Sequence, residues 1–256
     1  VFMLTDLEQD NDLSIDNSNQ IPYATVSQSA FVYAEPQIVT IDGIRGKFFS
    51  KRLYHTVVNF ITDFANNDEV LSWLARERFG VEFMVANEQT ENIMGEDSSN
   101  FQEFFNSEKL EILAMFEELP EGFHKQEGLK YLVRRINGQD DPAMPSAAAI
   151  AFGGRNTIEF MSKAFNGGDI NGARRIILHE KAHFLWFYSF DQTLKDDWAE
   201  LGGWFIDPTS ASGWSTYNTT EVVSAYAHLK SPSEDIAESI AYYLTNPDAL
   251  LSVSVR

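Results

Sequence analysis

The sequence contains no cysteine among its 256 residues, and it has only five histidines. The absence of cysteine excludes disulfide bonds, thiolate metal ligands and a cysteine nucleophile. A transition metal in this chain would therefore be bound by histidine and carboxylate side chains. The absence assigns no cellular compartment, because a chain of this length can form a large core without disulfides.

Basic residues and long apolar runs are also scarce. The chain has 19 lysines and arginines against 38 acidic residues, which gives a formal net charge of -19. Such a charge repels phosphate backbones and anionic lipids, so we expect no nucleic-acid partner. No apolar run approaches the roughly 20 residues that span a bilayer, so we expect no membrane insertion. The oligomeric state does not follow from the composition.

The first 22 residues are polar and acidic and offer little to a core. We predict that residues 1–22 form a flexible acidic lead-in. The chain begins with Val1 and not with methionine. This start indicates a removed leader or a piece of a longer protein, and we expect a secreted, extracellular protein.

The remaining residues mix helical and strand patterns without a clear linker. We predict helices at 108–119, 129–136, 173–188 and 231–244, and strands at 147–152 and 157–161. We therefore predict one α+β domain over residues 23–256. It would have a mixed upstream lobe and a helical downstream lobe around a cleft, meeting near the helix at 173–188.

Two of the five histidines lie in that helix, in the pattern His179-Glu180-Lys181-Ala182-His183. Side chains four residues apart share a helix face, so both imidazoles can bind one zinc ion. Glu180 can then act as the general base that takes a proton from a zinc-activated water. The alternative is an amphipathic helix that merely carries these residues. The apolar flanks predict half-buried imidazoles, however, and a buried histidine needs a partner. The pattern therefore predicts a zinc site.

A catalytic zinc ion usually has three protein ligands, and the third must come from another segment. The helix predicted at 231–244 carries Glu234 and Glu238 one turn apart on a shared face. One of them can bind zinc while the other accepts a hydrogen bond from the outer nitrogen of a ligand histidine. Glu234 has a second interpretation, because Ser231-x-x-Glu234 is a capping box. If Glu234 serves as a cap, Glu238 becomes the ligand.

The two segments together resemble the gluzincin-type zinc metallopeptidases related to the anthrax lethal factor catalytic domain and the Pro-Pro endopeptidases. The resemblance rests on His179-Glu180-x-x-His183 and on Tyr226 followed by Glu234-x-x-Ala237-Glu238. It implies a zincin-like fold with His179, His183 and Glu234 as zinc ligands and Glu180 as the general base.

The resemblance also implies that Tyr226 donates a hydrogen bond to the oxyanion of the tetrahedral intermediate. The interval from Tyr226 to Glu234 is a residue longer than in lethal factor, so His228 is an alternative donor. Ordinary aromatic packing is a further interpretation of Tyr226. By analogy with zincins, the strand at 157–161 would line the cleft and pair with an extended peptide, unless it is an inner strand.

The function that follows is a zinc-dependent endopeptidase that cleaves a protein or peptide substrate. The competing hypothesis is a catalytically inactive zincin that acts as a binding or toxin-delivery module. Glu180 argues against the second hypothesis, because a purely structural zinc site does not require a base at that position.

Overall fold

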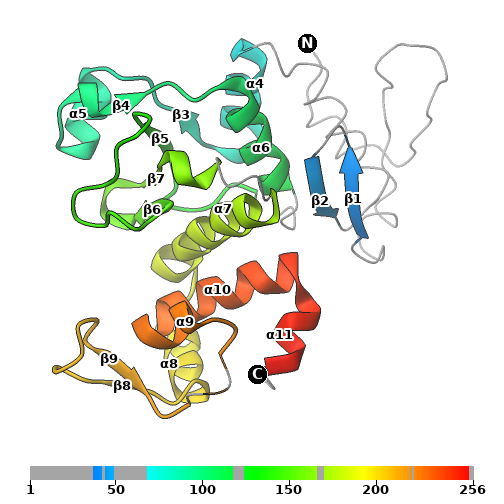
Figure 1. The fold of residues 1–256 in the computed structure, drawn as a ribbon, viewed down its shortest axis with the longest axis vertical. Coiled ribbons are helices and arrows are strands. Elements are labelled where there is room, and N and C mark those ends of the chain that lie inside the picture. Colours follow the sequence, from blue (N-terminus) through cyan, green and yellow to red (C-terminus); the bar gives the residue numbers. More distant parts are fainter. Residues whose placement is uncertain are drawn as a thin grey trace. The chain divides into compact units, whose positions relative to one another are not determined.

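A computed structural model describes residues 68–117, 124–165, 170–218, 220 and 222–253, together with strands β1 (Gln37–Ile41) and β2 (Ile44–Phe48). The lead-in predicted at residues 1–22 lies outside these residues. The chain combines helices with small sheets, in agreement with the α+β class (Figure 1). It divides into two compact units, Val1–Phe83 with Glu103–Lys125, and Met84–Gln102 with Gln126–Arg256. The prediction of a single domain over residues 23–256 stays a prediction.

The first unit is built around two helices, α4 (Asp68–Phe79) and α6 (Asn106–Glu117). Phe79 and Phe116 meet edge to face with ring centroids 5.7 Å apart, and both are buried. The buried guanidinium of Arg78 donates two hydrogen bonds, of 2.6 and 2.7 Å, to the carboxylate of Glu117. This bidentate pair satisfies two charges that would otherwise be costly to bury. The unit also contains β1, β2 and β3 (Glu82–Phe83).

The second unit contains a small sheet whose hydrogen-bonded order is β4, β5, β7, β6. Its strands are β4 (Phe101–Gln102), β5 (Tyr131–Arg135), β6 (Ala149–Phe152) and β7 (Thr157–Phe160). β5 and β7 are parallel, whereas β6 is antiparallel to β7. Every residue of β7 is buried, as expected of a strand with neighbours on both sides.

The helices α7 to α11 of the second unit follow the sheet in the sequence. α7 (Ile170–Phe184) packs against β6 and against α10 (Pro232–Thr245), and α7 and α10 lie side by side in Figure 1. None of the described helices is both long and apolar enough to span a membrane. The other elements are α5 (Glu88–Met94), α8 (Gln192–Leu201), β8 (Trp204–Ile206), β9 (Trp214–Thr216), α9 (Ala225–Lys230), α11 (Pro247–Val253) and the short helical turns η1 (Ser98–Asn100), η3 (Gly153–Arg155), η4 (Ser162–Ala164) and η5 (Leu185–Ser189).

Two predictions about the sheet were wrong. The segment 129–136 was predicted to be a helix, but it forms β5. Its apolar residues satisfy a helical spacing by chance, and pairing with β7 places both faces of the strand in the core. For the strand at 157–161, lining the cleft was wrong and the alternative is confirmed: it is β7, the inner strand between β5 and β6. Within the described residues, the edge position beside it belongs to β6.

Candidate metal centre

The helix predicted at 173–188 is present as α7 and carries the two histidines on one face. α7 begins at Ile170, and after Phe184 the helix continues as a π-helical turn, η5. α10 begins with Ser231 as its N-cap, whose hydroxyl accepts a hydrogen bond from the amide of Glu234, and Pro232 occupies the first turn. Only this half of a capping box is formed. The carboxylate of Glu234 is directed to the histidines of α7.

Three ligand-type atoms from these two helices form a nearly equilateral triangle. Nε2 of His179 lies 3.1 Å from Nε2 of His183 and 3.1 Å from Oε2 of Glu234. Nε2 of His183 lies 3.4 Å from the same oxygen. Zinc binds nitrogen and oxygen at about 2.0–2.1 Å in tetrahedral geometry, so its ligand atoms lie about 3.3 Å apart. The triangle therefore fits three ligands of a single zinc ion.

The donor set also has the chemistry that zinc requires. Within the described part of the chain, His179, His183 and Glu234 are the group of at least three such side chains that could hold a metal ion. Two imidazole nitrogens facing each other at 3.1 Å compete for one proton at most, and a cation between them satisfies both lone pairs. Two neutral imidazoles and a carboxylate form a common ligand set of catalytic zinc.

Glu238 contacts the outer side of His179. Its Oε1 lies 2.9 Å from Nδ1 of His179, and its Oε2 accepts a hydrogen bond of 2.6 Å from the hydroxyl of Ser224. The Nδ1 contact is short but lacks the alignment of a full hydrogen bond. A carboxylate at this nitrogen favours the tautomer that leaves Nε2 free for a metal. The geometry therefore matches Glu234 as the ligand and Glu238 as the outer partner.

His183 is held differently. Its Nδ1 is buried and has no hydrogen-bond partner, but its ring stacks on Phe187 with a centroid distance of 5.9 Å and an interplanar angle of 15°. Phe187 belongs to η5 and lies against Gly153, where an added Cβ would approach the phenyl ring to 2.8 Å. Because no polar group contacts Nδ1, the aromatic stack on Phe187 supports this side of the imidazole.

The two helices are antiparallel and meet in a regular register. Arg175, His179 and His183 follow one another by one turn on α7, and Glu234, Glu238 and Tyr242 do so on α10. The hydroxyl of Tyr242 lies 3.3 Å from Nη1 of Arg175. The contacts thus run from Arg175 with Tyr242, through His179 with both glutamates, to His183 with Glu234. We refer to this series as the α7–α10 ladder.

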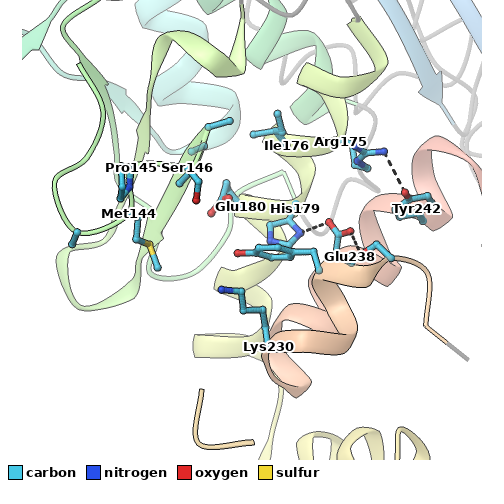
Figure 2. A pocket seen from close by; sticks show the side chains of 16 residues that line it. Met144, Pro145, Ser146, Arg175, Ile176, His179, Glu180, Lys230, Glu238 and Tyr242 are labelled. Atoms are coloured by element: carbon cyan, nitrogen blue, oxygen red, sulfur yellow. Dashed lines mark hydrogen bonds and ion pairs between the residues drawn. The ribbon is translucent and has the colours of Figure 1, made fainter. Parts of the chain in front are cut away.

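A pocket of about 560 Å³ opens beside the ladder. His179 and Glu180 line it from α7, and Glu238 lines it from α10. Figure 2 shows Glu180 on the side of His179 that faces Met144, whereas Glu238 lies on the opposite side. Glu180 is only 8% exposed, and the structure thus places its carboxyl group in the pocket wall next to the first histidine.

Tyr226 lies in the same pocket. It is 47% exposed, so it is not packed in the core, and its ring centroid lies 6.0 Å from that of His179. Burial and three nearby glutamates raise the pKa of Tyr226 above its ordinary value, so the phenol keeps its proton. A protonated phenol can donate a hydrogen bond to a developing oxyanion. His228 belongs to α9, but its side chain lies outside the described residues.

The charges of the metal-free cluster are strongly coupled. Burial acts to lower the pKa of His179, but the carboxylates of Glu234 and Glu238 outweigh it and raise that pKa to about 10. The pKa of Glu234 is low in spite of its burial, because it contacts both histidines. Burial raises the pKa of Glu180, and the nearby histidines act in the opposite direction. Metal binding at such a site displaces a proton from the histidine.

The wall of the pocket opposite α10 is formed by residues 143–149, and a buried ion cluster anchors this loop. Asp141 accepts hydrogen bonds of 2.9 and 2.8 Å from the first two amides of the loop. Nη2 of Arg135 lies 3.5 Å from the Asp141 carboxylate, and Nε of Arg135 lies 2.5 Å from Glu159 in β7. Arg135 also donates to both oxygens of Glu96, at 3.1 Å. The cluster connects the sheet to the loop that shapes the pocket.

Several residues of the site were not identified from the sequence. Arg175 and Tyr242 could have been found, because each lies one turn beyond a predicted site residue on the same helix face. Ser224 and the loop at 143–149 carry no such signal, since only the fold brings them to the pocket. Trp204 serves the core, where its indole donates a hydrogen bond of 3.1 Å to the buried Asp235.

The chain was compared with known protein families, curated proteins and solved structures, and no relative was found.

Proposed function

We propose that this protein is a zinc-dependent endopeptidase with a zincin-like fold, which hydrolyses peptide bonds in protein or peptide substrates. The observation that carries the proposal is the triangle of His179 Nε2, His183 Nε2 and Glu234 Oε2, with sides of 3.1, 3.1 and 3.4 Å. It occurs beside a pocket that also contains Glu180. The resemblance to the gluzincin-type peptidases supports the same function.

A zinc ion held by these three side chains would polarise the scissile carbonyl and make a bound water acidic. The remaining steps belong to the chain itself. Glu180 takes the proton of the attacking water as the new carbon–oxygen bond forms. It then delivers that proton to the amine as the carbon–nitrogen bond breaks.

Two further groups assist these steps. Tyr226 donates a hydrogen bond to the oxygen of the attacked carbonyl, which carries negative charge until the amine leaves. Glu238 and Ser224 act through His179 and not on the substrate, because their contacts lie on the outer side of its ring. Residues 143–149 form one wall of the pocket beside these groups.

The proposal is tested by combining metal analysis with digestion of a peptide library. The native chain should hold a single zinc ion and cleave a subset of the peptides. Glu180→Gln should keep the zinc but lose about 10²–10⁴-fold in kcat/KM, the usual contribution of a general base. Glu200→Gln is the matched control, because Glu200 is exposed on α8 and the exchange removes the same charge.

Two outcomes would contradict the proposal in different ways. If the native chain binds no zinc, the triangle is not a metal site. If it binds zinc but cleaves nothing, like Glu180→Gln, the protein is an inactive zincin that acts as a binding module.

A further inference from the structure

The pocket contains two cationic side chains although the chain as a whole is strongly acidic. Arg175 and Lys230 both line it, in a protein with a net charge of -19. Where acidic residues are twice as frequent as basic ones, cations are expected to be paired with carboxylates. Arg175 and Lys230 differ in this respect.

Arg175 is engaged within the ladder. Its guanidinium lies 3.3 Å from the hydroxyl of Tyr242 and 5.2 Å from the centre of that ring. It also lies near enough to Glu238 to act on the charge of that carboxylate. These contacts hold the guanidinium of Arg175 against α10, so Arg175 is less free than Lys230 to bind a further anion.

Lys230 has no such partner. It is the last residue of α9, it is exposed, and its amine lies over the ring of Tyr226 at 5.4 Å from the centroid. Among the residues that the structure describes, no carboxylate forms an ion pair with it. In Figure 2 the side chain of Lys230 extends toward the wall of the pocket that carries Met144. The amine is therefore held at the pocket by an aromatic face, and its three donors remain available.

With a divalent ion bound, the formal charge of the pocket would be opposite in sign to that of the whole protein. Glu180, Glu234 and Glu238 supply three negative charges at the site. Arg175, Lys230 and a bound divalent ion would together outweigh them by one positive charge. An anionic group entering beside Tyr226 thus meets an unpaired cation, while the carboxylates lie deeper around the histidines.

We propose that this pocket selects peptides that carry an aspartate or glutamate side chain close to the scissile bond, and that Lys230 binds that carboxylate. The proposal rests on the proposed function and specifies its substrate class. Tyr226 orients the amine of Lys230 through the ring face. The rest of the acidic surface repels anionic peptides at long range, so the selection acts through this contact and not through electrostatic steering.

The size of the effect follows from the exposure of Lys230. Ion pairs at exposed positions contribute up to about 1 kcal/mol, which corresponds to about fivefold in affinity. We therefore expect a three- to fivefold preference for an acidic side chain over its neutral amide.

The test is a double-mutant cycle between protein and peptide. Peptides cleaved by the native chain are resynthesised in pairs that differ by glutamate or glutamine at one position near the scissile bond. The ratio of kcat/KM within each pair is measured for the native chain, for Lys230→Gln and for Lys195→Gln. Lys195 is the matched control, because its amine lies 5.6 Å from the ring centre of Trp186 on another part of the unit and does not line the pocket. Comparing the ratio in Lys230→Gln with the ratio in Lys195→Gln removes the general repulsion by the acidic surface, because both exchanges remove one positive charge.

A second measurement separates this inference from the proposed function. The zinc-loaded Glu180→Gln protein, with and without Lys230→Gln, is titrated with the fluorescently labelled glutamate and glutamine peptides, and binding is followed by anisotropy. If no peptide has been cleaved, the pairs are taken from an acidic peptide library.

The expected result is a three- to fivefold preference for the glutamate peptide that Lys230→Gln abolishes and Lys195→Gln keeps. Equal ratios in all variants would overturn the assignment of Lys230, even if the native chain is an active peptidase. Loss of the preference in Lys195→Gln as well would overturn it too, because the effect would then come from net charge alone. If cleavage is absent but the binding preference depends on Lys230, the peptidase proposal fails and the acidic-peptide site stands.

Discussion

Exchanging Glu234 and Glu238 separately for glutamine distinguishes the two roles that these carboxylates have at His179. They lie one turn apart on α10 and contact opposite nitrogens of the same ring, Nε2 for Glu234 and Nδ1 for Glu238. Each exchange removes one charge and almost no volume. The difference between the two variants therefore reports position, not size.

The expected magnitudes follow from the two positions. Zinc sites with four ligands bind with about 10–16 kcal/mol, or about 2.5–4 kcal/mol for each ligand, so Glu234→Gln should weaken zinc binding by about 10²- to 10³-fold. Loss of an outer partner of a ligand histidine costs about 10- to 100-fold in metal affinity, which is the expectation for Glu238→Gln. Glu200→Gln removes the same charge from the exposed face of α8 and should leave the affinity unchanged.

The assay is a zinc titration against a chelator of known affinity, at fixed pH and salt, together with the zinc content per chain. A larger loss in Glu238→Gln than in Glu234→Gln would refute the ligand assignment and would make Glu238 the third ligand. If both variants behave like Glu200→Gln, the triangle does not bind zinc at all.

Three further exchanges test the surroundings of the site. Gly153→Ala should displace Phe187 from His183 and cost about 1–3 kcal/mol in the free energy of unfolding, with weaker zinc binding, because the new Cβ would lie 2.8 Å from the ring. Gly154→Ala, which meets nothing within 4 Å, is its control, and equal effects in the two variants would contradict the account. Arg135→Met should cost about 3–5 kcal/mol in urea unfolding, because it leaves buried carboxylates without a cation, and a neutral result would show that the ion cluster does not anchor the loop. Burial and then a nearby glutamate raise the pKa of Glu111 to about 7, so native stability should fall as the pH rises from about 4.5 to 7. Because Glu111 is partly exposed, we expect Glu111→Gln to reduce this pH-dependent loss of unfolding free energy by about 1–2 kcal/mol. An unchanged pH profile of stability in Glu111→Gln would contradict the assignment.

Local sequence signals predicted the helices of the site and the spacing of its residues. The apolar flanks of His179 and His183 indicated a helix that becomes α7, and Ser231 with Pro232 marked the start of α10. These signals are contained in a few consecutive residues, since capping and helical period act over one or two turns.

The choice between Glu234 and Glu238 could not be made from the sequence, because both share a helix face and either can reach an imidazole. The register of α10 against α7 separates them, and that register depends on packing between segments more than 50 residues apart in the chain. The strand β5 was missed for a related reason, since pairing with β7 outweighed a helical spacing of its apolar residues. The loop at 143–149 is held at the pocket by long-range contacts, among them the contact of Arg135 with Asp141 and the backbone hydrogen bond from Met161 to Ala148.

The α7–α10 ladder also implies that one variable, the position of α10 along α7, determines which glutamate can bind the metal. A shift of α10 by one turn, about 5.4 Å, would bring Glu238 opposite His183 and Tyr242 opposite His179. The slipped arrangement would again pair a carboxylate with a histidine, but it would break the contacts of Ser224 with Glu238 and of Arg175 with Tyr242. These two contacts, at the borders of the site, therefore oppose a shift of α10 along α7. A sequence that lost both could exchange one glutamate for the other as zinc ligand without any change in α10 itself.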